Sequence, residues 1–435
     1  MTPRGRLLVI TFHYPPDGSV GGLRWAGLSK YLARLGWEVH VITAANQYRE
    51  TPVDGVYVHG VERAKTLNDV YTAYQARRQA PASGALPRQR ASGPPAEAHR
   101  GRAGMLGRIR DSLATSLVLP DNARGWLTRM GLRARRQLRQ APFDAIVVSG
   151  PPHSSHIIGA LLARSGSPRL FVDMRDPWSI SDKDGSRRVP FNSSLMRVLM
   201  PRLERFVFNR ADAIVSNSAE FADALRISYP RLDIRYIPNG VDPDRLVVPR
   251  GERRPGVTIG YAGTLYGRRS VTSVLKAMRS FLGDHPDAAN ALRLRIAGMM
   301  DAAHADTFGS DVREAKLETA VEFLGRVSPA EALELLAESN IALVLAQNQP
   351  MQVPAKLYEC VGMRVPTLAI AEASSATYRE ALRIGAAVRE PDDIDGIAKV
   401  IEQAWIGALH PPDSIAAIDY ARIADEWHTL LLAAG

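Results

Sequence analysis

The chain has 435 residues, which is more than one hydrophobic core normally holds, so we expect two domains. A hydrophobic content of 46% and a charged content of 23% are the values of a globular protein. The single cysteine, Cys360, excludes an internal disulfide and suits a reducing compartment.

The N-terminal sequence shows no signal-peptide pattern, because its apolar run at 7–12 is short and leads into two prolines. No stretch approaches the ~20 consecutive apolar residues that a membrane-spanning helix needs. We therefore expect a cytoplasmic protein, either free or attached to the inner face of the cell membrane only at its surface.

Positive charge is concentrated in the N-terminal half. The net charge is +10; residues 1–243 contain 35 Lys/Arg against 20 Asp/Glu, and the remainder contains 20 against 25. The two parts thus carry +15 and −5. This asymmetry favours an anionic partner, which is a nucleic acid, an acidic membrane surface or a phosphorylated lipid. A solvated basic surface that follows from an arginine-rich composition is the alternative.

A strand–loop–helix–strand pattern opens the chain. Residues 6–11 are a continuous apolar run typical of a buried strand, residues 23–35 have helical periodicity, and residues 38–43 form a second strand. This βαβ order predicts a parallel sheet. In the first loop, Gly21 and Gly22 would let backbone amides approach a ligand phosphate, although a tight turn explains the pair equally well.

Two arginine-rich stretches follow. Residues 77–110 contain eight arginines, one acid and four prolines without apolar periodicity, which predicts a flexible basic insertion. Residues 126–138 predict a helix with several arginines and with Leu127 and Met130 on an apolar side. Such a helix either lies in a membrane interface or packs on the core with a solvated basic face.

The next strands of the N-terminal half end in polar turns. We predict strands at 143–149, 170–174, 213–216 and 234–237. Because open α/β sheets bind ligands at the carboxyl ends of their strands, His153, Arg175 and Asp176 are candidate catalytic residues. A satisfied loop histidine, or a structural pair of Asp173 and Arg175, is the simpler explanation.

A second α/β series begins after a Pro-, Gly- and Arg-rich stretch at 247–256, which fits an interdomain linker. We predict strands at 257–261, 292–297, 321–323 and 341–345, and helices at 271–281, 329–338 and 416–432. Two parallel α/β domains in tandem leave a cleft between their sheet edges, and this cleft is the expected ligand site.

The stretch 353–370 (VPAKLYECVGMRVPTLAI) predicts a short helix that ends at Gly362 and a buried strand after it. Lys356 and Glu359 are three residues apart and share one face of this helix. The helix follows a predicted strand, so its N-terminus would lie at the carboxyl edge of the sheet, a position suited to phosphate and ribose. An ordinary surface ion pair is the alternative.

Taken together, these segments resemble the GT-B superfamily of glycosyltransferases, and specifically its retaining family 4 group. The matching segments occur in the family's order: HYPPDGSVGGLRWAGLSKYLARLGWEVHVIT, SGPPHSSH, DMRDPW, IPNGVD, YAGTLYGRR, EFLGRVS and VPAKLYECVGMRVPTLAI. The resemblance implies an α/β fold of two Rossmann-like parallel-sheet domains facing a cleft. Its domains would be an acceptor domain at 1–243, a donor-binding domain at 255–412, and a helix at 413–435 that crosses back to the N-terminal domain.

The resemblance also implies which residues bind the donor. Glu359 would hold the ribose hydroxyls, and Arg269 would contact the diphosphate where the family usually has a lysine. Thr264 occupies the position of a second basic residue, so that contact is either missing or supplied by Arg268. The remaining implied donor-binding residues are Gly21, Gly22, Arg326 and Lys356. No metal or cofactor is implied, because basic side chains and helix N-termini neutralise the leaving diphosphate.

At the reacting centre, the resemblance places Asp176 and Arg175 near a histidine that many relatives carry. One departure concerns Met351, which occupies the position of a glutamate that contacts the donor sugar in the family. Gln352 or backbone amides would then replace that contact.

The activity implied is transfer of a sugar, with retention of its anomeric configuration, from a nucleotide-diphosphate donor to a hydroxyl acceptor. A lipid-linked or polysaccharide precursor at the cytoplasmic membrane face is the expected acceptor. Alternatives are a nucleotide-sugar epimerase of the same fold and a non-catalytic nucleotide-sugar-binding partner protein, the latter suggested by Met351. No recognition motif supports a nucleic-acid partner.

Overall fold

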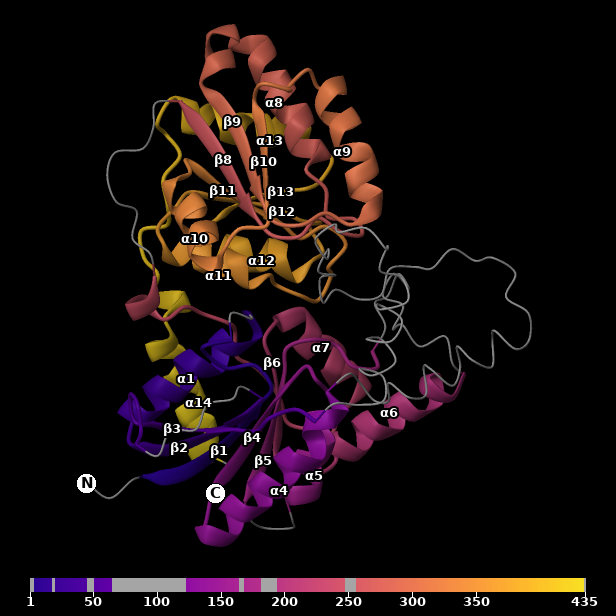
Figure 1. Ribbon diagram of the computed structural model, residues 1–435, viewed down its shortest axis with the longest axis vertical. Helices are drawn as coiled ribbons and strands as arrows, with labels where there is room; N and C mark the ends of the chain where they lie inside the picture. The colour runs from indigo at the N-terminus through magenta and orange to yellow at the C-terminus, as the bar shows by residue number, and fades with distance from the viewer. Residues whose placement is uncertain are drawn as a thin grey trace, which may run out of the picture.

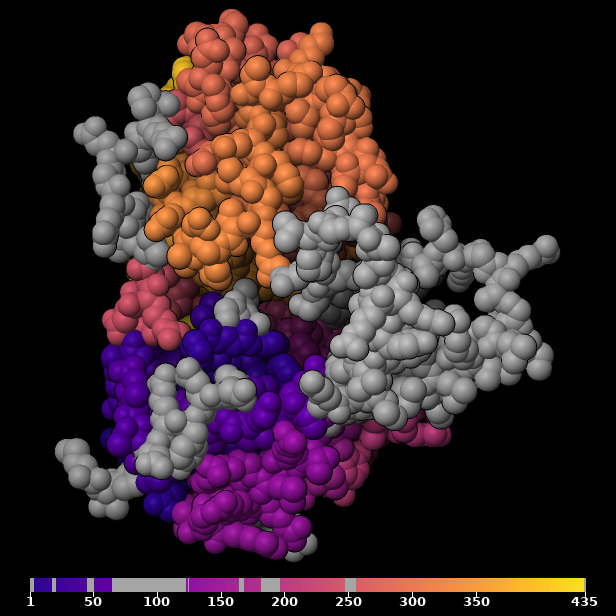
Figure 2. All heavy atoms as spheres, viewed as in Figure 1, coloured from indigo at the N-terminus to yellow at the C-terminus, as the bar shows by residue number. Residues whose placement is uncertain are grey.

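The computed structural model describes residues 4–17, 20–44, 51–64, 123–163, 168–180, 194–246 and 256–433. It consists of two parallel-sheet α/β lobes stacked end to end, as Figures 1 and 2 show. The fold class expected from the sequence is therefore confirmed. The basic insertion predicted at 77–110 lies outside the described residues, as does most of the predicted linker.

The N-terminal lobe contains a seven-stranded parallel sheet with the order β3-β2-β1-β4-β5-β6-β7. Its strands are β1 (Gly5–Thr11), β2 (Trp37–Thr43), β3 (Val56–Gly60), β4 (Ala145–Gly150), β5 (Arg169–Met174), β6 (Ala213–Ser216) and β7 (Ile234–Tyr236). Its helices are α1 (Leu23–Arg34), α4 (Arg124–Gln140), α5 (Ser154–Leu162), α6 (Ser194–Phe208) and α7 (Ala219–Ser228).

Alternation along the strands divides this lobe into two apolar layers. Leu8 and Ile10 of β1 face the core beneath α4, α5, α6 and α7, whereas Leu7 and Val9 face the core beneath α1. A buried parallel strand must be apolar on both faces, which is why these segments read as continuous apolar runs.

The C-terminal lobe contains a six-stranded parallel sheet with the order β10-β9-β8-β11-β12-β13. Its strands are β8 (Val257–Ala262), β9 (Leu292–Ala297), β10 (Val321–Gly325), β11 (Ile341–Leu345), β12 (Thr367–Ile370) and β13 (Ala387–Arg389). Its helices are α8 (Thr272–Asp284), α9 (Ala302–Glu314), α10 (Pro329–Glu338), α11 (Ala355–Gly362), α12 (Ala376–Arg383) and α13 (Ile394–Trp405).

The last helix, α14 (Tyr420–Ala433), leaves the C-terminal lobe and packs on α1 in the N-terminal lobe (Figure 1). The indole rings of Trp25 and Trp427 meet edge to face, with 5.0 Å between centroids. Gly27 permits this approach, because a Cβ there would lie 2.2 Å from Cδ2 of Tyr420. The apolar face of α14 thus completes the N-terminal core.

Helix α4 packs on the core through the side that carries Met130. Trp126, Met130 and Ala134 are fully buried against the sheet, so the side of the helix that includes Met130 is not available to a membrane interface. Leu132, on the opposite side, is 65% exposed.

Several elements were not predicted or were placed differently. A polar turn was predicted after the strand at 143–149, but α5 already begins at Ser154. Helix α6, which starts at Ser194 and contains Pro201, was not among the predicted helices given above. Two of the four edge strands and four further helices were missed: β3, β13, α7, α9, α12 and α13.

Candidate functional site

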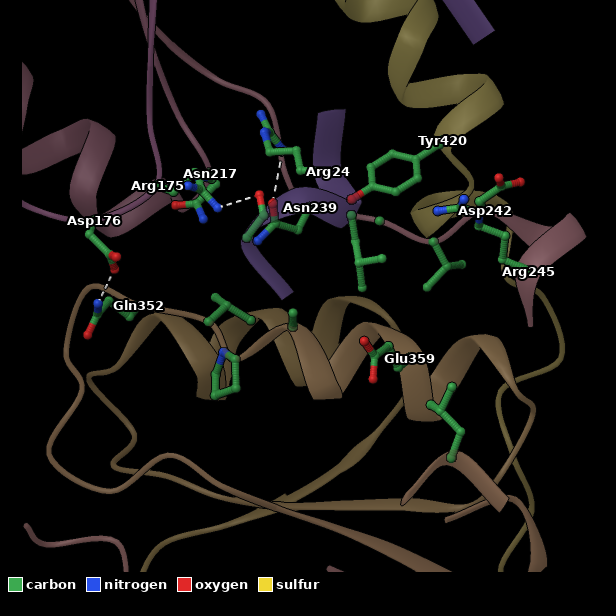
Figure 3. Close-up of a pocket in the computed structure, with 18 of the residues that line it drawn as sticks. Arg24, Arg175, Asp176, Asn217, Asn239, Asp242, Arg245, Gln352, Glu359 and Tyr420 are labelled. Atoms are coloured by element: carbon green, nitrogen blue, oxygen red, sulfur yellow. Dashed lines mark hydrogen bonds between the residues drawn. The ribbon is translucent and has the colours of Figure 1, made fainter. Parts of the chain in front are cut away.

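A cavity of about 330 Å³ lies where the carboxyl ends of the two sheets face each other. Its N-terminal wall comes from the segments after β1, β5, β6 and β7, and its C-terminal wall from the segments after β8 and β11 and from α11. Figure 3 shows residues of the two walls pointing toward one another. The predicted site residues that line it are Gly21, Arg175, Asp176, Arg269 and Glu359.

Glu359 is carried by α11, whose sequence fixes its direction. Leu357, Tyr358 and Cys360 are fully buried against the sheet, so Glu359 lies on the side that faces the cavity (Figure 3). Its carboxylate accepts a hydrogen bond from Lys356 Nζ at 2.5 Å. Lys356 does not itself line the cavity, so its role is to hold the carboxylate of Glu359 in position.

The predicted arginine pair after β8 is separated by the structure. Arg269 lines the cavity, with its guanidinium 4.8 Å from the ring centroid of Tyr266, whereas Arg268 is exposed and does not line it. Arg326 is likewise exposed and outside the cavity lining. Within the described residues, Arg269 and Arg245 form no ion pair, so two cationic groups at the cavity are available to an anion.

Gly21 and Arg175 form one unit on the N-terminal wall. Arg175 donates from Nη1 to the Gly21 carbonyl at 2.7 Å and from Nη2 to the Pro151 carbonyl at 2.8 Å. A Cβ at Gly21 would lie 2.6 Å from Nη1 of Arg175, so any other residue would displace the guanidinium. Gly22 packs on the backbone of Tyr14 at the start of α1 and does not line the cavity.

A buried ion pair supports this wall. Asp173 and Arg24 are both almost fully buried, and Arg24 Nε lies 3.1 Å from Asp173 Oδ1. Asp173 also accepts from Trp25 Nε1 at 2.8 Å and from Ser149 Oγ at 2.7 Å. Arg24 donates further to the carbonyls of Ile237 and Pro238. The alternative pairing of Asp173 with Arg175 is therefore wrong.

His153 and Asp176 differ in their relation to the cavity. His153 precedes α5 and stacks on Trp178, with 5.2 Å between ring centroids, but does not line the cavity. Asp176 lines it and accepts a hydrogen bond from Gln352 of the opposite lobe (Figure 3). The structure thus brings Asp176, but not His153, to the candidate reacting centre.

Met351 is used as a contact between the lobes. Its side chain is buried against the core of the N-terminal lobe, and its carbonyl accepts a hydrogen bond from Ser218 Oγ at 2.5 Å. Two further side-chain contacts cross the same boundary, from Tyr236 to Glu380 and from Arg379 to Glu220. The position where the family carries a glutamate therefore serves packing in this chain.

Replacing Met351 with glutamate should consequently destabilise the protein instead of restoring a sugar contact. A carboxylate buried against apolar groups is strongly unfavourable, so we expect the thermal midpoint to fall by about 5 °C or more. Differential scanning calorimetry measures this, with Met351→Leu as the apolar control. An unchanged midpoint together with faster sugar transfer would contradict the packing role.

A pH effect is expected from His156, which is fully buried on α5 behind this wall. Burial lowers its pKa from 6.5 to about 4. Between these values the unfolded chain binds a proton that the folded chain does not, so stability falls as the pH is lowered through this range, by up to about 3 kcal/mol. Burial lowers the pKa of His59 to about 4 as well, so His59 also makes the folded chain less stable as the pH falls.

Urea unfolding at pH 7.5 and pH 5 checks the contribution of His156. We expect His156→Gln to reduce the pH-dependent loss of stability but not to abolish it, because burial also lowers the pKa values of His59 and His40. An unaltered pH dependence in this variant would contradict the assignment.

Sequence reasoning missed several residues that line the cavity. Asn217 directly follows β6 and Asn239 lies three residues after the end of β7, so the rule that selected Asp176 could have found them. Tyr420 belongs to α14, and nothing in the neighbouring sequence indicates that its side chain lines the cavity. In the described ranges, no three His, Cys, Asp or Glu side chains cluster closely enough to hold a metal ion. None of the described helices has the length and apolar character needed to cross a bilayer.

Comparisons with known proteins agree with this architecture. Residues 21–240, half of the chain, match the family described as the glycosyl transferase 4-like domain. No curated protein sequence matches the chain. Solved structures with a similar fold include sucrose-phosphate synthase from Thermosynechococcus elongatus, with 13% identity, a TM-score of 0.59, and coverage of 99% of this chain and 100% of that chain.

Two further solved structures are similar over nearly their full length. HepE from Anabaena in complex with UDP and glucose has 12% identity and a TM-score of 0.59, with 99% of this chain and 100% of that chain covered. A UDP-forming α,α-trehalose-phosphate synthase from Burkholderia xenovorans has 14% identity and a TM-score of 0.59, with 99% and 98% covered. With its two facing parallel-sheet lobes, this chain has the GT-B fold and belongs to the glycosyl transferase 4-like family.

Proposed function

We propose that the protein transfers a sugar from a nucleotide-diphosphate donor to a hydroxyl acceptor. The observation that carries this proposal is that Glu359 and Arg269 of one lobe line the same cavity as Gly21 and Arg175 of the other. A carboxylate, basic groups and a glycine loop in one cavity suit the ribose, the diphosphate and the sugar of such a donor.

Each part of the donor has a matching group. Glu359 can accept hydrogen bonds from the ribose hydroxyls, and the adjacent N-terminus of α11 favours negative charge. Arg269 and Arg245 supply positive charge for the diphosphate, without a metal in this proposal. HepE, whose structure was solved in complex with UDP and glucose, supports this type of ligand by analogy of fold.

We propose that the transfer retains the anomeric configuration, with the leaving phosphate assisting deprotonation of the acceptor hydroxyl. The protein then contributes positioning and charge stabilisation. Asp176 orients the acceptor or the sugar in this proposal, with Gln352 holding its carboxylate, and Arg175 keeps the Gly21 loop in place. His153 does not contact the reacting groups in this proposal; its ring stacks on Trp178 outside the cavity.

The acceptor that we propose is a lipid-linked or polysaccharide precursor at the cytoplasmic face of the membrane. The charge of the chain supports an anionic acceptor, because residues 1–243 carry a net charge of +15. The wall of the cavity that lies opposite α11 is formed by this half of the chain, except for Tyr420, Arg245 and Leu246.

The test is release of nucleoside diphosphate from a panel of UDP-, GDP-, ADP- and dTDP-sugars, measured with and without a membrane lipid extract as acceptor source. Release that requires the extract supports a transferase. Conversion of the donor without the extract indicates an epimerase, and binding without conversion indicates a non-catalytic protein. Absence of binding to every donor would overturn the proposal.

A further inference from the structure

Three helices form a continuous outer surface on one side of the N-terminal lobe. Helices α4, α5 and α6 pack side by side on one face of the sheet, in that order. Each buries one stripe and turns the opposite stripe outward. We call the outward surface the arginine face; its exposed cations are Arg129, Arg135, Arg136 and Arg139 of α4 and Arg197, Arg202 and Arg205 of α6.

The arginine face lacks compensating negative charge from its own helices. The sequences of α4, α5 and α6 contain nine arginines and a single acid, Glu204. Glu204 is fully buried, where it accepts hydrogen bonds from Ser179 and Tyr229. The opposite side of the lobe differs, because α1 and α14 place acids such as Asp425 beside their basic residues.

Large apolar side chains stand among these arginines, one from each helix. Leu132 of α4 is 65% exposed, Leu161 of α5 is 60% exposed and Val198 of α6 is 48% exposed. Within the described part of the chain, the exposed large aromatic side chains are Tyr266 and Phe323, and both belong to the C-terminal lobe. The exposed side chains of the arginine face are thus basic and aliphatic; Phe206 of α6 is half-buried beneath the guanidinium of Arg210.

We propose that the arginine face docks the protein on an anionic lipid bilayer. Arginines attract acidic lipid headgroups, and the outward leucines and valine bury apolar surface when they enter the boundary of the acyl chains. The phosphate backbone of a nucleic acid offers no such apolar region. A single-stranded nucleic acid would need exposed aromatic side chains for its bases to stack on, and no described aromatic side chain of this face is exposed. Docking on the bilayer does not depend on the proposed function. The consequence that docking presents a lipid-linked acceptor to the cavity does rest on the proposed function.

Sedimentation of the full-length protein with sucrose-loaded vesicles tests the proposal. We expect binding to phosphatidylcholine vesicles that contain 30% phosphatidylglycerol, and at least tenfold weaker binding to pure phosphatidylcholine. Arg135→Glu/Arg139→Glu should weaken binding to the anionic vesicles by about thirtyfold or more, since each basic residue near the surface contributes a factor of about five. The control Arg279→Glu/Arg313→Glu makes the same charge change on exposed arginines of the C-terminal lobe and should bind like the wild type.

A second pair of variants separates a bilayer from other polyanions. Leu132→Ser/Leu161→Ser should weaken vesicle binding several-fold while binding to heparin and to a 20-nucleotide RNA stays unchanged. Donor binding should be the same in all variants, so a failure of docking is distinguishable from a failure of the proposed function. Vesicle binding that ignores the Arg135/Arg139 change, or RNA binding tighter than vesicle binding and unaffected by the leucine changes, would overturn the proposal.

Discussion

Replacing Glu359 with glutamine should weaken binding of the nucleotide-diphosphate sugar by about ten- to a hundredfold. Glutamine keeps the size of the side chain but removes the negative charge that the cavity presents from α11. Hydrogen bonds to a charged acceptor contribute about 1.5–3 kcal/mol each, and one such difference corresponds to this range of affinity. Isothermal titration calorimetry with the preferred donor measures the change.

Two controls make this result specific. Glu338→Gln removes an exposed carboxylate from the same lobe and should leave donor affinity unchanged. Lys356→Met leaves the carboxylate of Glu359 in place and removes only its partner, so a smaller loss is expected. If Glu359→Gln bound the donor as tightly as Glu338→Gln does, the donor would not be held at α11.

Breaking the buried pair of Arg24 and Asp173 should have the largest effect on stability. Removing one partner leaves the other charge buried without compensation, which costs about 3–5 kcal/mol. For a lobe of this size we expect the thermal midpoint of Arg24→Met to fall by about 6–20 °C. Arg34→Met on the same helix is the control, because Arg34 is exposed and its contact with Asp244 is 3.4 Å long.

A double-mutant cycle identifies the cause of this loss. Asp173→Asn keeps an acceptor for Trp25 and Ser149 but removes the charge. The double variant Arg24→Met/Asp173→Asn should therefore be less destabilised than the sum of the two single variants. Additive losses, or a midpoint for Arg24→Met equal to that of Arg34→Met, would show that the pair contributes no coupling.

Local patterns in the sequence predicted most of the framework. The strands at 213–216, 292–297 and 341–345 and the helix at 329–338 have the bounds that were expected. Apolar runs, the alternation of apolar residues and arginines at 292–297, and a Ser-Pro helix start with a capping glutamate are strong local signals. The edge strand β3 was missed, although the edge strand β10, which has the same length and is more exposed, was predicted at 321–323.

The site was less predictable, because it depends on contacts between distant segments. The rule that ligands bind after parallel strands selected Arg175, Asp176 and Glu359 correctly as residues lining one cavity. It could not distinguish Arg269 from its neighbour Arg268, since a single loop bend decides which guanidinium turns inward. Nor could it find Arg24, whose charge is compensated by Asp173, 149 residues away.

The two chain crossings between the lobes lie against each other. The backbone amide of Val241, on the outgoing crossing, donates to the Ile418 carbonyl at 2.8 Å, and the amide of Tyr420, on the returning one, donates to the Val241 carbonyl at 3.0 Å. If the two lobes move apart to widen the cavity, this paired segment is therefore the expected hinge of their rotation. The side chains of Asp176 and Gln352 join the two lobes at the cavity itself, so a rotation that widens the cavity would separate them.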